Sequence, residues 1–423
     1  MSRLGDLDRA HVLHPHAVVG APEPPVVFVR GEGALLWDEN GNEYVDGTCG
    51  LWVCPVGHGR RELADAARRQ MEELEYYASF WEFSNPPSIE LAARLAELSP
   101  PGLERVFFTN GGSESTETAI KLARLAWHAR GELERTIVLT RKLAYHGVSY
   151  GSLGATGLPP LREGFGPLPG DFVHLAAPFP FRGTTTDGLV AELEQAIEEV
   201  GAGRIAAFIG EPVIGVGGMI PPHDDYWPRV AEVLERNGIL LILDEVVTAY
   251  GRTGTWFAAE HWNLRPDLVA TAKALTSGYF PLGVVLVGDR VVEALDGQAF
   301  RHGFTYNGHP TGCAVALENL RIIESEGLLD RARELGGHLL DRLRELEELD
   351  AVGEARGFGL MAGLELQVED ATALAARVRE RGVIVRATGQ KLVMSPPLVI
   401  ECEQLDRIVD VLAEELAAAA VAT

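Results

Sequence analysis

Lysine and basic charge are scarce in this chain. Of 423 residues only four are lysines, and the 37 lysines and arginines together face 61 aspartates and glutamates, a formal net charge of −24. A surface of this sign repels nucleic acids and anionic membranes, and no stretch rich in lysine or arginine offsets it. We therefore expect neither a nucleic acid nor a membrane as a partner.

Long apolar runs and metal-binding motifs are also missing. No apolar segment approaches the roughly 20 residues that span a bilayer, and the N-terminal sequence MSRLGDLDRAHVLHPH contains no apolar signal core. No HExxH motif occurs, and no CxxC pair is formed by the four cysteines, Cys49, Cys54, Cys313 and Cys402. The sequence predicts free thiols, no metal site and a cytoplasmic enzyme.

Amphipathic segments and short apolar runs alternate through the middle of the chain. Helical periodicity marks residues 61–75, 86–98 and 114–130. Between the helices lie the short apolar runs 106–108, 136–139, 205–209, 239–243, 268–272 and 282–287. This alternation is typical of an α/β protein with a mostly parallel central sheet flanked by helices.

The character of the sequence changes near residue 315. Long helices rich in Leu, Arg and Glu follow, and then shorter strand-like segments and a final Ala-rich helix. We predict a large domain at 60–315 and a smaller α+β domain at 316–423. Residues 1–59 are expected to form an N-terminal arm and part of the small domain.

The apolar run 239–243 ends abruptly in two carboxylates, Asp244 and Glu245. Exposure to solvent would explain the pair. If the run is a central parallel strand, however, its carboxyl end faces the crevice where open α/β sheets bind ligands. A carboxylate at that place can meet a positively charged group.

Lys273 follows another apolar run, 268–272, among small residues. A lysine at a strand end can simply extend its ammonium to solvent. In a desolvated pocket, its lowered pKa would instead let it form a Schiff base with a carbonyl. Together, Lys273 and Asp244 fit pyridoxal phosphate, because the lysine can hold the aldehyde carbon and the aspartate can keep the ring nitrogen protonated.

A phosphate site is suggested by FFTNGGSESTETAIK, in which a strand and a Gly-Gly-Ser turn lead into a helix. The first-turn amides of such a helix can bind an anion, although an ordinary turn capped by Ser113 also fits. Tyr145, in YHG, could stack on a pyridine ring or lie on a surface loop. The Gly-rich segment 151–157 lacks a preceding apolar strand, so we do not interpret it as a dinucleotide loop.

Six motifs, in this order, resemble those of the class III omega-aminotransferases of pyridoxal phosphate fold type I: GGSESTETAIK, YHG, EPVIGVGG, LDEVVTAYGRTG, ATAKALTSGYFPLG and HGFTYNGHP. The resemblance runs from about residue 20 to the C-terminus. It implies a pyridoxal 5'-phosphate enzyme that transfers an amino group from an amine or omega-amino acid to a keto acid, with pyruvate the expected acceptor. It also implies a homodimer with active sites at the subunit interface.

The resemblance implies cofactor-binding roles for residues in all of these motifs. Lys273 would form the Schiff base and Asp244 would pair with the ring nitrogen. Val246 and Tyr145 would cover the two ring faces. Gly112 and Ser113 would bind the phosphate, and Thr305 would reach the phosphate of the neighbouring subunit. Glu211 would support the hydrogen-bond network on the cofactor side.

The substrate pocket implied by the resemblance is aromatic. Trp52 would form its wall, with Phe80 and Trp81 beside it, although buried core aromatics would account for all three. Phe304 would line the pocket of the neighbouring subunit. Val216 stands where many relatives carry alanine, which should narrow the pocket against bulky amines.

Arg386, in GVIVRATGQKLVMSPPL, lies where the family has a mobile arginine that binds the keto acid carboxylate. A surface arginine at a strand end is the alternative.

Aminomutases and decarboxylases share the fold type, so the motifs alone do not exclude these two activities. A ligand-sensing regulator would need an added DNA-binding module. The amine donor stays open among beta-alanine, polyamines, taurine and amino ketones.

Overall fold

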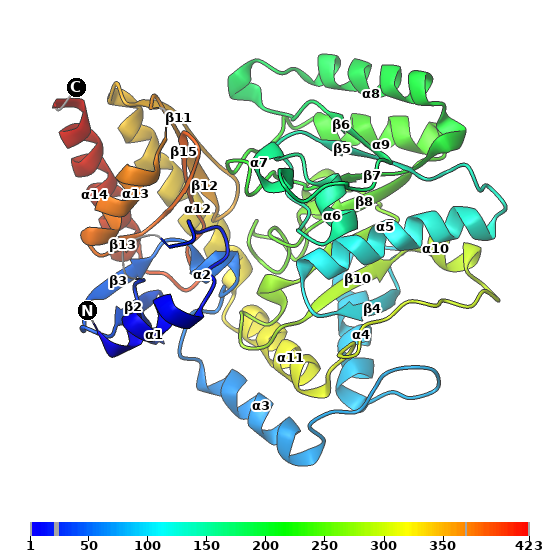
Figure 1. The fold of residues 1–423 in the computed structure, drawn as a ribbon, viewed down its shortest axis with the longest axis horizontal. Helices are drawn as coiled ribbons and strands as arrows, with labels where there is room; N and C mark the ends of the chain where they lie inside the picture. Colours follow the sequence, from blue (N-terminus) through cyan, green and yellow to red (C-terminus); the bar gives the residue numbers. More distant parts are fainter. Residues whose placement is uncertain (1, 21–24, 369, 422–423) are drawn as a thin grey trace.

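The computed structural model describes residues 2–20, 25–368 and 370–421. A large part surrounds a seven-stranded sheet, and a smaller part contains two four-stranded sheets (Figure 1). In the described residues, no helix combines the length and apolar character needed to cross a membrane.

The seven-stranded sheet confirms the expectation of a mostly parallel α/β core. Its strands, in spatial order, are β4 (Arg105–Thr109), β10 (Gly283–Val287), β9 (Leu268–Thr271), β8 (Leu240–Asp244), β7 (Ile205–Gly210), β5 (Ile137–Arg141) and β6 (Phe172–Leu175). Neighbours from β9 to β6 are parallel, whereas β10 is antiparallel to both β4 and β9. The parallel strands therefore end at one common edge.

Both faces of this sheet are buried, which explains its uninterrupted apolar strands. Leu240 and Ile242 of β8 pack in one hydrophobic core with α5, while Leu241 and Leu243 pack in another with α9. A strand covered on both faces needs apolar residues at every position. The helices of this part are α4 (Pro86–Leu98), α5 (Gly112–Ala129), α6 (Tyr150–Ala155), α7 (Pro159–Arg162), α8 (Thr186–Val200), α9 (Tyr226–Arg236), α10 (Asp289–Ala294) and α11 (Pro310–Ser325).

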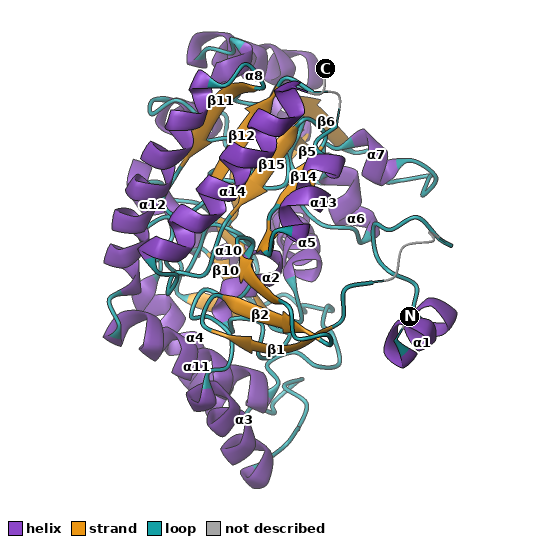
Figure 2. Ribbon diagram, turned by 90° about the vertical axis from the view of Figure 1, so that its left-hand side faces the viewer, coloured by secondary structure: helices purple, strands orange, loops and turns teal. Residues whose placement is uncertain are grey.

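The smaller part joins the two ends of the chain. One sheet has the order β1 (Phe28–Glu32), β2 (Leu35–Asp38), β3 (Glu43–Asp46) and β13 (Val383–Ile384), and β13 pairs in parallel with β3. The other is the antiparallel sheet β11 (Val352–Gly357), β12 (Ala362–Leu366), β15 (Lys391–Met394) and β14 (Arg386–Thr388). Figure 2 shows the helices that cover it, α12 (Leu328–Glu345), α13 (Thr372–Glu380) and α14 (Cys402–Val421).

The remaining elements are short or peripheral. Helix α1 (Arg3–His11) lies apart from the sheets in Figure 2, and α3 (Arg61–Glu73) packs against α11. The short helical turns are α2 (Cys49–Trp52), η1 (Pro180–Arg182), η2 (Ala202–Arg204), η3 (Ala258–Trp262), η4 (Lys273–Leu275) and η5 (Leu346–Glu348). The predicted domain boundary at 315/316 lies inside α11, and the division into domains stays a prediction.

Candidate active site

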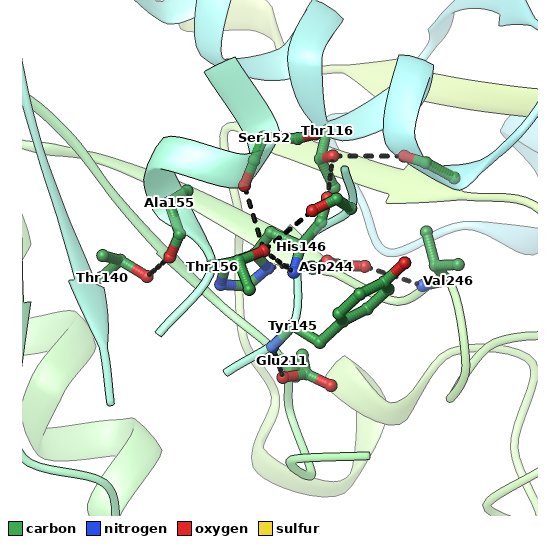
Figure 3. A network of polar contacts seen from close by, with 12 residues as sticks. Thr116, Thr140, Tyr145, His146, Ser152, Ala155, Thr156, Glu211, Asp244 and Val246 are labelled. Atoms are coloured by element: carbon green, nitrogen blue, oxygen red, sulfur yellow. Dashed lines mark hydrogen bonds and ion pairs between the residues drawn. The ribbon is translucent and has the colours of Figure 1, made fainter. Parts of the chain in front are cut away.

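Asp244 is the last residue of β8, and its carboxylate is buried at the carboxyl edge of the sheet. His146 Nδ1 lies 2.7 Å from Asp244 Oδ2, and the Val246 amide donates to Oδ1 at 3.1 Å (Figure 3). Because an ionised carboxylate only accepts, Nδ1 carries the hydrogen in this contact. The two donors orient Asp244 and leave lone pairs with which it can accept a further N–H.

Lys273 lies two residues beyond the end of the neighbouring strand, β9, at the start of η4, with φ at 43°. This left-handed conformation is uncommon for a residue with a side chain and marks a tightly determined position. Burial lowers the pKa of Lys273 to about 8, against the opposing effect of the carboxylates of Asp244 and Glu211. Much of the amine is therefore neutral in mildly alkaline solution, as a nucleophile requires.

Glu211 connects two loops at the same edge of the sheet. Its Oε1 accepts a hydrogen bond from the Tyr145 amide at 3.0 Å, and its Oε2 accepts one from the Gly215 amide at 2.8 Å. Burial raises the pKa of Glu211, and the nearby His146 and these two amides oppose that rise. The carboxylate thus holds the Tyr145 loop against the loop that carries Val216. Figure 3 shows Tyr145 and His146 diverging from their shared loop.

The N-terminus of α5 lies beside Asp244 and is open for an anion. The helix begins at Gly112 behind Gly111, and no side chain of the described residues caps it. A Cβ on Gly112 would lie 2.7 Å from Val246 Cγ1, so Val246 packs directly against the first turn. The Val148 amide donates to Ser113 Oγ at 3.1 Å. An uncapped 18-residue helix presents free amides and the positive end of its dipole to a phosphate.

Trp52 and Val216 are buried in one apolar cluster, against which Tyr145 packs. Lys273 Nζ lies 5.3 Å from the centroid of the Trp52 ring, and Arg386 Cζ lies 5.1 Å from it. Arg386 opens β14 and is half-buried, and burial lowers the pKa of its guanidinium. Among the described residues its guanidinium has no hydrogen bond or ion pair, although its backbone pairs with Val393 of β15. It is therefore an unpaired cation at an apolar wall.

The structure places the other four predicted site residues elsewhere. The rings of Phe80 and Trp81 are 5.6 Å apart, and a Cβ on Gly303 would touch Phe80 at 2.7 Å. The Tyr76 hydroxyl donates to the carbonyl of Thr305, next to Phe304. Within the described part of the chain, no hydrogen bond or aromatic contact joins this second group to Trp52 or Lys273. We call Phe80, Trp81, Phe304 and Thr305 the outer group.

His146 was missed by the sequence interpretation, which considered only the tyrosine of YHG. The imidazole is fully buried and its Nδ1 contacts Asp244, while its Nε2 has no hydrogen-bond partner within the part of the chain that the structure describes. The Thr116 hydroxyl donates to the His146 carbonyl, which ties this loop to α5. Its position next to Tyr145 was the one indication in the sequence that His146 belongs to the site. No local sequence pattern predicts that residue 146 contacts Asp244.

Comparisons with known proteins agree with this arrangement. The sequence profile described as Aminotransferase class-III matches residues 17–416. The chain belongs to the class III aminotransferase family. It is 42% identical over 405 residues to a putrescine–pyruvate aminotransferase of Pseudomonas aeruginosa, covering 90% of this chain and 88% of that protein. Class III aminotransferases use pyridoxal phosphate, and an amine transaminase of similar structure was solved in its PLP-bound form.

Solved structures of omega-transaminases superpose closely on the chain. A thermostable (S)-enantioselective omega-transaminase from Thermomicrobium roseum has a TM-score of 0.95 at 48% identity, covering 98% of both chains. An omega-transaminase of Pseudomonas jessenii, solved in complex with PMP, has a TM-score of 0.95 at 36% identity, covering 99% of this chain and 98% of its own. Fold and family therefore agree along nearly the whole length.

The residues present fit the cofactor of a class III aminotransferase. When bound, pyridoxal phosphate supplies an aldehyde that condenses with amines and a pyridinium ring that withdraws electrons. The chain has a carboxylate already anchored by His146, an amine in Lys273 and an uncapped helix start at Gly112, all at one edge of the sheet. Their chemistry matches the ring nitrogen, the aldehyde and the phosphate respectively.

Proposed function

We propose that this class III aminotransferase moves the amino group of a primary amine without a carboxylate to pyruvate. The observation that carries the proposal is Arg386, half-buried and unpaired beside Trp52 in an apolar cluster. An amine with an apolar body fits the wall, and a keto acid needs the guanidinium. The 42% identical putrescine–pyruvate aminotransferase supports the same pairing of substrates.

The proposed roles follow from the positions of the groups. Lys273 is the amine that would hold the cofactor through its aldehyde, and the free amine would carry the proton that leaves or returns to the substrate carbon. Asp244, oriented by His146, would hold the ring nitrogen and keep it protonated. The start of α5, with Gly112 and Ser113, binds the phosphate. Val246 and Tyr145 cover the ring faces.

One pocket must accept an amine that lacks a carboxylate and a keto acid that has one. A fixed, fully buried guanidinium would be unpaired with the first substrate, at a cost of several kcal/mol. Arg386 keeps partial access to solvent at the start of β14. We propose that it turns inward to form a bidentate contact with the pyruvate carboxylate and outward when the amine occupies the pocket.

We further propose a homodimer in which the outer group completes the site of the neighbouring subunit. In the single chain the outer group has no role near Lys273, yet Trp81 is 86% exposed. Tyr77 and Phe83, which are close to it in the sequence and in contact with each other, are exposed as well, and large apolar side chains gathered on a surface mark an interaction site. In a two-fold dimer, Thr305 would reach the neighbour's phosphate and Phe304 would line its substrate pocket.

The donor panel that tests the function uses pyruvate with putrescine, beta-alanine, taurine and 1-phenylethylamine. We expect one alanine for every carbonyl product, with faster turnover for donors that lack a carboxylate. Release of carbon dioxide without alanine would indicate a decarboxylase, and an isomerised amine without alanine would indicate an aminomutase. Either result would refute the proposal.

Val216 offers a matched test of pocket size. Its side chain is buried against Trp52, so truncation should enlarge the amine pocket. In Val216→Ala we expect 1-phenylethylamine to gain about tenfold in kcat/KM relative to putrescine, because each methylene-sized difference is worth roughly 1–3 kcal/mol. Equal changes for both amines would show that residue 216 does not shape this pocket.

A further inference from the structure

Asp46, the last residue of β3, has a completely buried side chain. Its Oδ1 accepts hydrogen bonds from the amide and the hydroxyl of Thr48, at 3.0 and 2.9 Å, and its Oδ2 accepts one from the Gly50 amide at 2.6 Å. His58 Nε2 lies 3.0 Å from the same Oδ2. A buried charge is tolerated only when it is paired and hydrogen-bonded, so these groups stabilise one another. No step proposed above for amino transfer uses Asp46 or His58.

The turn that these hydrogen bonds hold, α2, has an unfavourable backbone. The φ angles of Cys49, Gly50 and Trp52 are 54°, 70° and 61°, and the helical geometry is broken at Gly50 and Leu51. Residues with a side chain rarely adopt this left-handed conformation, which persists only where surrounding contacts determine it. The carboxylate of Asp46 supplies two such contacts inside the turn, so the direction of the Trp52 side chain depends on it.

His58 ties this carboxylate to the first two strands of the chain. Its amide donates to the Gly33 carbonyl at 2.9 Å, and the Gly33 amide donates to the His58 carbonyl at 3.0 Å, in the turn between β1 and β2. Burial by itself would lower the pKa of His58, but the hydrogen bond to Asp46, the largest opposing cause, helps to raise it to about 9. At neutral pH the contact therefore joins an imidazolium to a carboxylate and is stronger than one between neutral groups.

Asp46 also lies beside the segment that leads to Arg386. In the sheet, Asp46 is the parallel partner of Ile384 in β13, and Arg386 opens the next strand, β14. The Trp52 ring lies 5.1 Å from Arg386 Cζ and 5.3 Å from Lys273 Nζ. A displaced indole would therefore change both sides of the apolar wall, the one that faces the amine and the one at the guanidinium.

We infer that Asp46 and His58 are positioning residues that fix Trp52 in the substrate pocket and thereby set how tightly the amine and the keto acid bind. Both act through the turn α2. Loss of the histidine donor leaves Oδ2 with the Gly50 amide alone, and the turn relaxes from its left-handed conformation. Substrate binding then weakens more than the chemical steps slow, because Asp244 has its own donors. The effect on substrates rests on the proposed function, whereas the placement of Trp52 does not.

Three variants separate positioning from general packing. His58→Leu removes the donor, and His58→Gln keeps an amide N–H that can reach Asp46 without the charge. His338→Leu is the matched control, because His338 Nε2 lies 2.9 Å from Asp406 Oδ1 in a similar pair between α12 and α14. Asp46→Asn, which replaces one acceptor oxygen by a donor, should disturb the turn more than any of them. If Asp46→Asn does not fold, the histidine variants still decide the question.

The placement of Trp52 is measured by fluorine NMR on the cofactor-loaded protein labelled with 5-fluorotryptophan. The resonance that disappears in Trp52→Phe identifies the indole. We expect this resonance to shift or broaden in His58→Leu and to stay close to its parent position in His58→Gln and His338→Leu. An unmoved Trp52 resonance in His58→Leu, or an equal displacement in His338→Leu, would overturn the inference. The measurement uses no substrate, so its result is independent of the proposed function.

Steady-state kinetics with 1-phenylethylamine and pyruvate test the effect on the pocket. In His58→Leu we expect both KM values to rise about tenfold and kcat to stay within about twofold, the pattern of lost binding without lost catalysis. His58→Gln should recover most of the affinity, and His338→Leu should match the parent. A fall in kcat at unchanged KM, or equal losses in the leucine and glutamine variants of His58, would overturn the positioning role. A parent that transfers no amino group to pyruvate would refute the proposed function instead, and the fluorine spectra would still decide the placement of Trp52.

Discussion

His146 and Asp244 form a buried hydrogen-bonded pair, with Nδ1 and Oδ2 2.7 Å apart, although 98 residues separate them in the sequence. His146 contacts Oδ2 of the carboxylate, and the Val246 amide donates a hydrogen bond to Oδ1 at 3.1 Å. Because one donor is a buried imidazole and the other a backbone amide, the fold itself orients the carboxylate. Asp244 is thus preorganised to hold a proton on a ring nitrogen.

We predict unequal losses when the two members of this pair are changed. Asp244→Asn should lower kcat by about 10²- to 10³-fold, because an amide cannot stabilise a protonated ring nitrogen. His146→Gln should lose roughly tenfold, the effect of one hydrogen bond to a charged group. Stopped-flow measurement of each half-reaction, with circular dichroism as the folding control, tests this. A folded, cofactor-loaded Asp244→Asn protein with normal turnover would make Asp244 purely structural.

Lys273 should be the lysine that bonds to the cofactor, in preference to Lys121, Lys142 and Lys391. Borohydride reduction and peptide mapping should place the label on Lys273. The rate at which the cofactor-free protein captures pyridoxal phosphate should rise with pH through about 8 and then level off, because the lowered pKa makes Lys273 neutral above that value. Asp244→Asn removes an anion that raises this pKa, so the midpoint should move to lower pH. A label on another lysine contradicts the assignment.

Shared active sites can be tested with mixed subunits. Lys273→Ala should be inactive, and Thr305→Ala should release the cofactor more readily. In a hybrid of these two variants, one site combines an intact Lys273 with an intact Thr305 from the other subunit. At limiting cofactor, co-expression should therefore recover activity that neither variant shows alone. A fully active monomer, or the absence of recovery in verified hybrids, would rule out Thr305 in the neighbour's site.

Arg386→Ala should separate the two half-reactions. We expect the KM for pyruvate to rise about 10²-fold, consistent with the loss of a charged bidentate contact, and the half-reaction with putrescine to change less than about twofold. Arg386→Lys keeps the charge without the planar fork and should recover only part of the affinity. Comparable losses in both half-reactions would place Arg386 in the framework of the pocket instead of at the carboxylate.

Local sequence patterns were sufficient for the core and for the residues at its edge. Strands buried on both faces require uninterrupted apolar runs, so the run at 239–243 indicated a central strand with Asp244 at its end. Helix periodicity likewise located α3, α4 and α5. Ordered motifs then indicated the family, which the comparisons confirm. The individual roles of the site residues stay predictions.

Only the tertiary structure decided which distant residues meet. Burial is encoded locally, since each residue contributes its own hydrophobicity and position along a helix or strand. Partners across the fold depend instead on how loops close and pack. For this reason the antiparallel β10 and the contact of His146 with Asp244 appear only in three dimensions.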